Sequence, residues 1–201
     1  MTALLPITLH GTRVVLEPLA HEHHDGLVAA ARDGDLWNLW YTSVPEPDAM
    51  EREIGRRLDL QAAGSMLPFT TRTVDDDGNA GRIIGMTTYM NIDRDTPRVE
   101  IGSTWNARSA QRTGTNTESK YLLLRHAFEV IGCPAVEFRT HVLNHQSRAA
   151  IERMGAKQDG ILRSHTRSRD GALRDTVVYS VLAHEWPMVR EGLVHRSARY
   201  A

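Results

Sequence analysis

The sequence predicts an α+β fold formed by a single domain over residues 1–201. Two helical segments come early, a meander of strands follows, and the order helix, strand, helix, strand, strand completes the chain. A length of 201 residues is enough for one domain with a substantial core. The composition, 41% hydrophobic and 24% charged, is typical of a globular protein.

In the first third of the chain, residues 13–18 are expected to form a short strand. Residues 21–32 place Leu27, Val28 and Ala31 at helical spacing. A second helix is expected over residues 45–63, because prolines open the segment and a glycine follows it.

The central meander is expected to contain strands at residues 66–73, 82–90 and 98–105. The segment 75–79 between the first two is rich in Asp, Gly and Asn, which supply the backbone angles that a hairpin turn needs. Beyond residue 120 we expect the remaining elements in this order: a helix over 121–128 that stops at Gly132 and Pro134, a strand over 135–142, a helix after Asn144, a hairpin of strands 160–166 and 173–182, and a helical tail over 184–201.

Charge and composition exclude several classes of protein. The formal net charge is −1, which argues against a nucleic-acid binder held by a general electrostatic field. The lone Cys133 excludes an intramolecular disulfide and is expected to be a buried structural thiol. His21, His23 and His24 lack acidic or Cys partners at metal spacing, so no metal site is expected. No apolar run approaches a membrane span and no signal peptide opens the chain, so we expect no membrane partner and a cytoplasmic location.

Residues 100–118 are the most informative segment. A strand runs into a loop containing Gly114, and the loop opens directly into an apolar helix that Thr117 and Glu118 are expected to begin. A helix N-terminus carries unpaired N–H groups and a partial positive charge, so it is suited to binding phosphate. The loop has neither the Gly-Lys pair of a P-loop nor the glycine spacing of a dinucleotide-binding fold. An ordinary strand-loop-helix connection is the alternative.

Residues 111–116 resemble the Q/R-x-x-G-x-G/A loop of the GNAT acyltransferase superfamily, which holds the pyrophosphate of acetyl-coenzyme A. The matching residues are Gln111, Arg112, Thr113, Gly114, Thr115 and Asn116. Asn116 stands where the family usually has Gly or Ala. Because Asn tolerates positive φ better than most residues, we expect it to preserve the turn.

A second segment, residues 144–156, resembles the N-x-x-S/A…G-F segment of the same family, with Ala156 in place of Phe. The resemblance implies that Asn144 binds coenzyme A near its pantetheine arm. It is closest to the ribosomal-protein N-terminal acetyltransferase (Rim-like) branch, and it covers roughly residues 8–182. It implies a central mixed, mostly antiparallel sheet of about seven strands with helices on both faces, and a homodimer, as relatives often form.

The resemblance also implies catalytic roles. A backbone N–H near Trp105 or Asn106 would polarise the thioester, and Glu100 would be the general base. The alternative for Glu100 is a strand residue that faces solvent or pairs with an arginine. Many relatives have a tyrosine acid at the position of Ile151, so that route is absent. Ser147 would protonate the departing thiolate or only cap a helix.

The acceptor pocket of such an enzyme is walled by its first two helices. The aromatic residues Trp37, Trp40 and Tyr41 are expected there, either to receive a substrate side chain or to bury the helix pair. The predicted activity is direct transfer from acetyl-coenzyme A to an amine, preferentially the α-amine of a peptide, protein or amino-acid-like acceptor. The alternatives are a small-molecule amine acetyltransferase and a catalytically silent coenzyme A-binding module.

Overall fold

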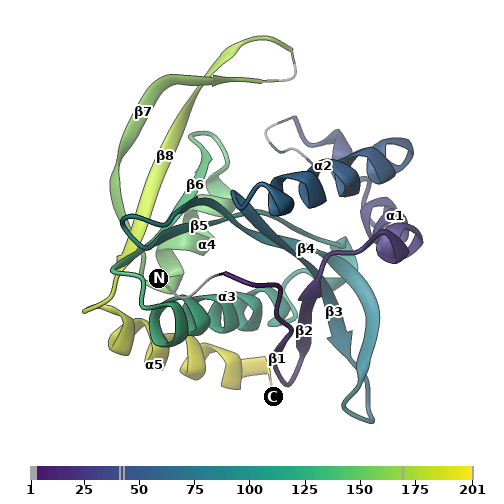
Figure 1. Cartoon of the computed structure of the whole chain (residues 1–201), viewed down its shortest axis with the longest axis horizontal. Helices are drawn as coiled ribbons and strands as arrows, with labels where there is room; N and C mark the ends of the chain where they lie inside the picture. The colour runs from purple at the N-terminus through teal and green to yellow at the C-terminus, as the bar shows by residue number, and fades with distance from the viewer. Residues whose placement is uncertain (1–3, 41, 43, 169, 201) are drawn as a thin grey trace.

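The computed structural model describes residues 4–40, 42, 44–168 and 170–200. They form an eight-stranded sheet with strand order β1-β2-β3-β4-β5-β6-β8-β7 (Figure 1). The strands are β1 (Leu9–His10), β2 (Val14–Pro18), β3 (Met66–Val74), β4 (Ala80–Asp93), β5 (Arg98–Asn106), β6 (Ala135–His141), β7 (Lys157–Arg167) and β8 (Leu173–Leu182). The α-helices are α1 (His24–Arg32), α2 (Met50–Ala62), α3 (Thr115–Arg125), α4 (His145–Met154) and α5 (Trp186–Ser197).

The predicted α+β class and the mostly antiparallel mixed sheet are confirmed, with β1 as a strand beyond those expected. A strand of two residues is too short to show alternation in the sequence. The only parallel pairing among the described strands joins β5 and β6, and it holds over Arg98 to Glu100 against Ala135 to Glu137. Beyond Glu100 and Glu137 the two strands separate. This separation opens the sheet where the predicted cofactor segments lie.

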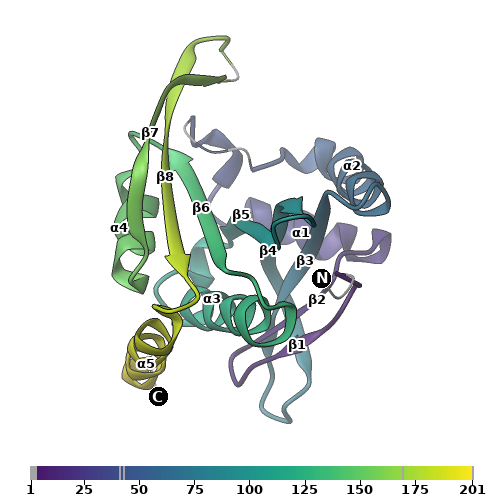
Figure 2. The same ribbon diagram turned by 60° about the vertical axis from the view of Figure 1, so that its left-hand side comes forward.

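Helices cover both faces of the sheet (Figures 1 and 2). Consecutive residues of β4 show which helix covers which face, because adjacent strand side chains point to opposite sides. Thr87 accepts a hydrogen bond from Lys120 of α3, whereas Thr88 accepts one from Arg57 of α2. The α2 face and the α3 face are therefore opposite sides of the same strand, and α5 packs outside α3.

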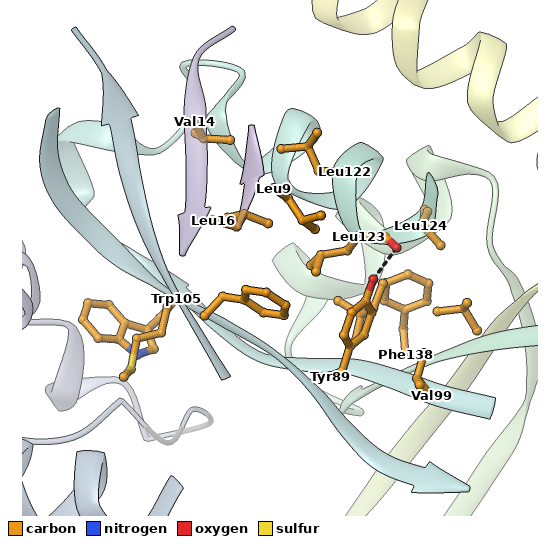
Figure 3. Packing of buried hydrophobic residues seen from close by; sticks show 14 of the residues in the cluster. Leu9, Val14, Leu16, Tyr89, Val99, Trp105, Leu122, Leu123, Leu124 and Phe138 are labelled. Carbon is orange, nitrogen blue, oxygen red and sulfur yellow. Dashed lines mark hydrogen bonds between the residues drawn. The ribbon is translucent and has the colours of Figure 1, made fainter. Parts of the chain in front are cut away.

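Buried residues of α1, α2 and α3 pack against the sheet in one core cluster. Tyr89 is fully buried, and its hydroxyl donates to the carbonyl of Leu123, which ties β4 to the helix (Figure 3). The α3 helix continues into a π-helical turn, His126–Ile131, that ends at Gly132 with φ 77°. The predicted stop at this glycine is thus confirmed, because a left-handed C-cap favours glycine.

The α3 helix begins at Thr115, two residues before the predicted start. Glu118 is buried, and its carboxylate accepts hydrogen bonds from the backbone N–H groups of Thr12, Arg13 and Val14 and from the Thr12 hydroxyl, at 2.7–3.0 Å. This carboxylate therefore anchors the turn between β1 and β2 to the helix that follows the cofactor loop. Glu118 faces that turn rather than the loop.

The tail that was predicted to be helical contains α5 and a short 3₁₀ turn, Ala198–Tyr200. Trp186 of α5 stacks on Phe128 with ring centroids 5.5 Å apart, and its indole N–H donates to Glu129 at 2.8 Å. The tail is thus held against the end of α3. Within the described residues, no helix has both the length and the apolar character that a membrane span requires.

Candidate active site

A cavity of about 690 Å³ opens where β5 and β6 separate. It gathers predicted site residues from β5, the loop before α3, α3 itself and the start of α4. The predicted residues that line it are Glu100, Trp105, Asn106, Gln111, Arg112, Gly114, Asn116, Asn144 and Ser147. Thr113 and Thr115 do not line it. Their hydroxyls instead donate to the carbonyl of Ala110, at 2.7 and 2.9 Å, and hold the loop in shape.

The loop turns through two residues with positive φ, Arg112 at 63° and Gly114 at 89°. Gly114 is the N-cap of α3, so the free N–H groups of the helix start beside it. Asn116 lies inside the first turn of α3 and is not among the residues with positive φ. The expected reason for tolerating Asn116 was therefore wrong, because no left-handed conformation is needed there.

Asn116 has another property that bears on ligand binding. Its side-chain oxygen is buried and has no hydrogen-bond partner among the described residues, although the residue lines the cavity. Buried polar atoms are normally paired. A ligand with hydrogen-bonding groups at the start of α3 would provide the missing partner, which fits coenzyme A held at this loop.

Glu100 lies on β5, and its side chain is buried. One carboxylate oxygen accepts from the amide of Asn91 at 2.7 Å and lies 3.5 Å from Nε of Arg139. Burial raises the pKa of Glu100, and the Asn91 hydrogen bond and Arg139 offset part of that rise. The alternative stated for Glu100, that it pairs with an arginine, is therefore realised by Arg139. The carboxylate nevertheless lines the cavity, so it can accept a proton from a bound molecule.

The strand β5 bulges two residues before its end. Met86 pairs with Trp105 and Thr88 with Gly102, so Ser103 and Thr104 together oppose Thr87. Ser103 has φ 48°, and a bulge leaves one residue outside the ladder of backbone hydrogen bonds. This places an irregular stretch of backbone beside the cavity, directly before Trp105 and Asn106.

Asn144, rather than Ser147, caps α4. The side-chain oxygen of Asn144 accepts from the backbone N–H of Ser147 at 3.0 Å. The capping alternative for the Ser147 side chain was therefore wrong. Ser147 lines the cavity and is partly exposed.

On the acceptor side, Leu36 and Leu39 line the cavity, and the predicted Trp37 and Trp40 are not among the lining residues. Trp37 packs against the core. Trp40 is 60% exposed and contacts the ring of His141, a lining residue, edge to face at 5.3 Å between centroids. Tyr41 lies outside the described residues.

Three further residues of the cavity were missed in the sequence. Arg57 of α2 is buried and pairs with Glu53 at 2.7 Å. Lys120 is buried on α3, and Tyr200 of the tail packs on the loop, because a Cβ added to Gly114 would lie 2.9 Å from its ring. Of the three, only Lys120 could have been singled out from the sequence, because lysine is rare in this chain, with two lysines against 22 arginines.

The described residues of the cavity include neither a metal-binding cluster nor a cysteine. Among residues 4–40, 42, 44–168 and 170–200, no group of three or more His, Cys, Asp or Glu could hold a metal ion. Cys133 is buried away from the cavity, and burial raises its pKa to about 11. A thiol in that state is a poor nucleophile near neutral pH.

Comparisons with known proteins agree with this geometry. YdaF of Bacillus subtilis, provisionally described as a ribosomal N-acetyltransferase, is 32% identical over 111 residues, which cover 53% of this chain and 57% of YdaF. A GCN5-related N-acetyltransferase from Brucella melitensis has a TM-score of 0.81 at 29% identity, covering 97% of this chain and 87% of that one. RimJ of Mycobacterium smegmatis, solved with CoA-disulfide, shares the fold with a TM-score of 0.78 at 22% identity, covering 95% of each chain.

The match to a family is the more decisive finding. Residues 13–157 match the acetyltransferase (GNAT) domain, and this range includes β2, the bulged β5, the loop before α3 and the capped α4. Enzymes of this family take their acyl group from acetyl-coenzyme A. The chain therefore belongs to the GNAT acetyltransferase family.

Proposed function

We propose that this protein transfers an acetyl group from acetyl-coenzyme A to the α-amine of a peptide, protein or amino-acid-like acceptor. The observation that carries the proposal is the shared cavity. It joins a glycine-capped helix N-terminus, suited to a pyrophosphate, to the buried carboxylate of Glu100. A binding site for an anionic cofactor and a candidate general base therefore share one cavity.

The residues of the cavity divide the chemistry between them. The N–H groups at the start of α3 hold the cofactor, and Arg112 adds a charge-assisted contact. The backbone at the bulge, near Trp105, donates to the carbonyl oxygen as negative charge develops on it. Glu100 takes the proton of the attacking amine, and its raised pKa brings it closer to neutral pH. With Cys133 buried elsewhere, transfer is direct within a ternary complex.

The preference for an α-amine follows from proton equilibria. An α-amino group has a pKa of roughly 7.7–8.0, whereas a lysine side chain has roughly 10.4. Near neutral pH a useful fraction of α-amines is already neutral, whereas a lysine amine depends much more on a strong base. YdaF, by its provisional description a ribosomal N-acetyltransferase, is consistent with this class of acceptor.

The test compares two peptides of the same sequence, one with a blocked N-terminus and a free lysine, the other with the reverse. Release of free thiol from acetyl-coenzyme A is measured for both. We expect faster release with the free N-terminus, and faster release with the lysine peptide would contradict the assignment. Activity confined to polyamines or aminoglycosides would favour a small-molecule acetyltransferase. Binding of coenzyme A without thiol release from any amine would favour a silent binding module.

A homodimer and a cytoplasmic location are part of the same proposal. The outer hairpin of β7 and β8 exposes the apolar side chains of Ile161, Leu162 and Leu173, and β7 is an edge strand. Covering these residues with a second copy would remove apolar surface from water. Light scattering at micromolar concentration should give twice the chain mass of 22.5 kDa, and a value near 22.5 kDa would exclude the dimer.

A further inference from the structure

Lys120 is a buried ammonium group on the α3 face of the sheet. Its side chain lines the cavity, and the residue is 6% exposed. The ammonium donates to the hydroxyls of Thr104 on β5, at 2.7 Å, and of Thr87 on β4, at 3.2 Å. In the described part of the chain, no carboxylate lies within the 4.0 Å of an ion pair. A buried cation without a counter-ion is unusual, because burial disfavours charge.

The residue type at this position matters as much as its burial. The chain places arginine at 22 positions and lysine at only two, and the other lysine, Lys157, is exposed and paired with Glu185. Arginine keeps its proton under all ordinary conditions, whereas a buried lysine releases it readily. Burial lowers the pKa of Lys120 to about 7, so both of its forms are populated near neutral pH.

Lys120 lies beside the bulge of β5. Its strongest partner, Thr104, is one of the two bulged residues and directly precedes Trp105. Two charged groups of the cavity, Glu100 on β5 and Arg57 on α2, lie on the opposite face of the sheet. The cavity is also lined by the arginines Arg112, Arg139, Arg153 and Arg174. Within the described residues, the hydrogen-bond partners of its nitrogen are the two threonine hydroxyls on β4 and β5.

We propose that Lys120 donates the proton that the coenzyme A thiolate needs as it leaves. This inference rests on the proposed function, which places the thioester carbonyl at the bulge. The amine nitrogen bonds to the carbonyl carbon, and Glu100 takes the proton that the amine loses. The carbon–sulfur bond breaks with its electron pair on sulfur, and the Lys120 ammonium transfers a proton to that sulfur. The products are an amide and the free thiol, and exchange with solvent restores the protons of Glu100 and Lys120.

The direction of this transfer is favourable. A thiol has a pKa of roughly 8.5, so an ammonium that titrates near 7 is the stronger acid of the two. Neutral Lys120 is also easier to bury than its charged form, which favours release of the proton. The site has Ile151 at the position where many relatives have a tyrosine, which leaves Ser147 on α4 and Lys120 on α3 as candidate acids of the cavity. Of the two, Lys120 is the stronger acid, because its ammonium titrates near neutral pH.

The test uses Lys120→Met and Lys120→Arg, with Lys157→Met as the matched control. We measure kcat for thiol release across pH and the Kd for desulfo-coenzyme A, which lacks the sulfur but keeps the phosphates. For Lys120→Met and Lys120→Arg we expect kcat to fall by about 100-fold, the lower end of acid–base contributions, with the Kd unchanged. The decline of the wild-type kcat above the pKa of Lys120 should be absent in Lys120→Met. Lys157→Met should match the wild type.

Three results would overturn the proposal. An unchanged kcat in folded Lys120→Met or Lys120→Arg would show that no proton comes from this residue. A parallel loss of affinity for desulfo-coenzyme A would show that Lys120 binds the phosphates instead. A wild type that releases no thiol with any amine would remove the proposed function as well, and that outcome is visible before any variant is made. Lys120→Arg keeps the buried charge, so it remains informative if Lys120→Met does not fold.

Discussion

The two faces of the sheet at the β5 bulge carry ionisable groups of opposite kind in different surroundings. On the α2 face, Glu100 has an amide hydrogen bond from Asn91 and a nearby guanidinium from Arg139. On the α3 face, the partners of Lys120 among the described residues are two hydroxyls. Burial raises the pKa of Glu100 and lowers the pKa of Lys120, so both move toward neutrality. Asn91 and Arg139 stabilise the charged form of Glu100, whereas no counter-ion among the described residues stabilises the charged form of Lys120.

This difference fits the division of work in the proposed reaction. A base must stay ionised while the acceptor enters, which the partners of Glu100 favour. An acid must release its proton when a better base appears, and a cation without a counter-ion does so readily. The cavity reaches both groups because β5 and β6 stop pairing beyond Glu100, and the bulge at Ser103 and Thr104 follows on the same strand.

Removing the carboxylate of Glu100 should have the largest effect. We expect Glu100→Gln to lower kcat/KM by roughly 10²–10⁴-fold, the usual contribution of a positioned base. The loss should be largest just above the pKa of Glu100, where the acceptor amine is mostly protonated, and smaller at alkaline pH. In the wild type, activity should fall as pH drops through that raised pKa, because the active form is ionised. The measurement is kcat/KM between pH 5 and 9.

Glu137→Gln is the matched control, since Glu137 pairs with Glu100 across β5 and β6 and contacts the same Arg139. Glu137 raises the pKa of Glu100, so this variant should keep the plateau rate and move the acid limb to lower pH. An equal loss in both variants would indicate that the arginine–carboxylate network, rather than the base, was disrupted.

The cofactor loop provides the next test. Gly114→Val should weaken coenzyme A binding by more than about tenfold, because a side chain at φ 89° is strained and blocks the close approach of backbone to phosphate. Calorimetry with coenzyme A measures the effect. Gly78→Val, at φ 83° with open space around it, carries the same strain far from the cavity and should bind normally. Because Gly114 also contacts Tyr200, Tyr200→Ala separates loss of the tail contact from loss of the loop.

The uncompensated charge of Lys120 should also be visible in stability. Its pKa is lower in the folded chain than in the unfolded chain, where it is roughly 10.4, so folding releases protons between about pH 7 and that value. Stability from this group therefore rises with pH across that window and is lowest below it. We expect Lys120→Met to unfold at a higher temperature than the wild type at pH 6, and the difference should shrink by pH 10. An equal difference at both pH values would show that the folded-state pKa is not lowered.

The sequence predicted the regular parts of this molecule well, for reasons that lie in local chemistry. Alternation and helix-stopping residues such as Gly64 and Gly132 located most elements, because these patterns depend on neighbours in the chain. The irregular parts were missed. The two-residue β1 has no periodicity, and the anchoring of residues 12–14 by Glu118 links positions more than 100 residues apart. Lys120 was missed because its hydrogen-bond partners, Thr87 and Thr104, belong to two strands that come near it only in the folded chain.

The smallest expected effect distinguishes two candidate acids. Ser147 on α4 and Lys120 on α3 line the same cavity, and the backbone N–H of Ser147 donates to the Asn144 cap. If Lys120 is the acid, Ser147→Ala should change kcat by less than about threefold, because the proton for the thiolate then comes from Lys120. Asn144→Ala should lower the free energy of unfolding by about 1 kcal/mol, the usual value of an N-cap, whereas Ser147→Ala should leave it unchanged. Thermal melts and thiol-release assays on both variants decide this. A large fall in kcat for a stable Ser147→Ala protein would move the acid from α3 to α4 and would leave Lys120 as a structural residue.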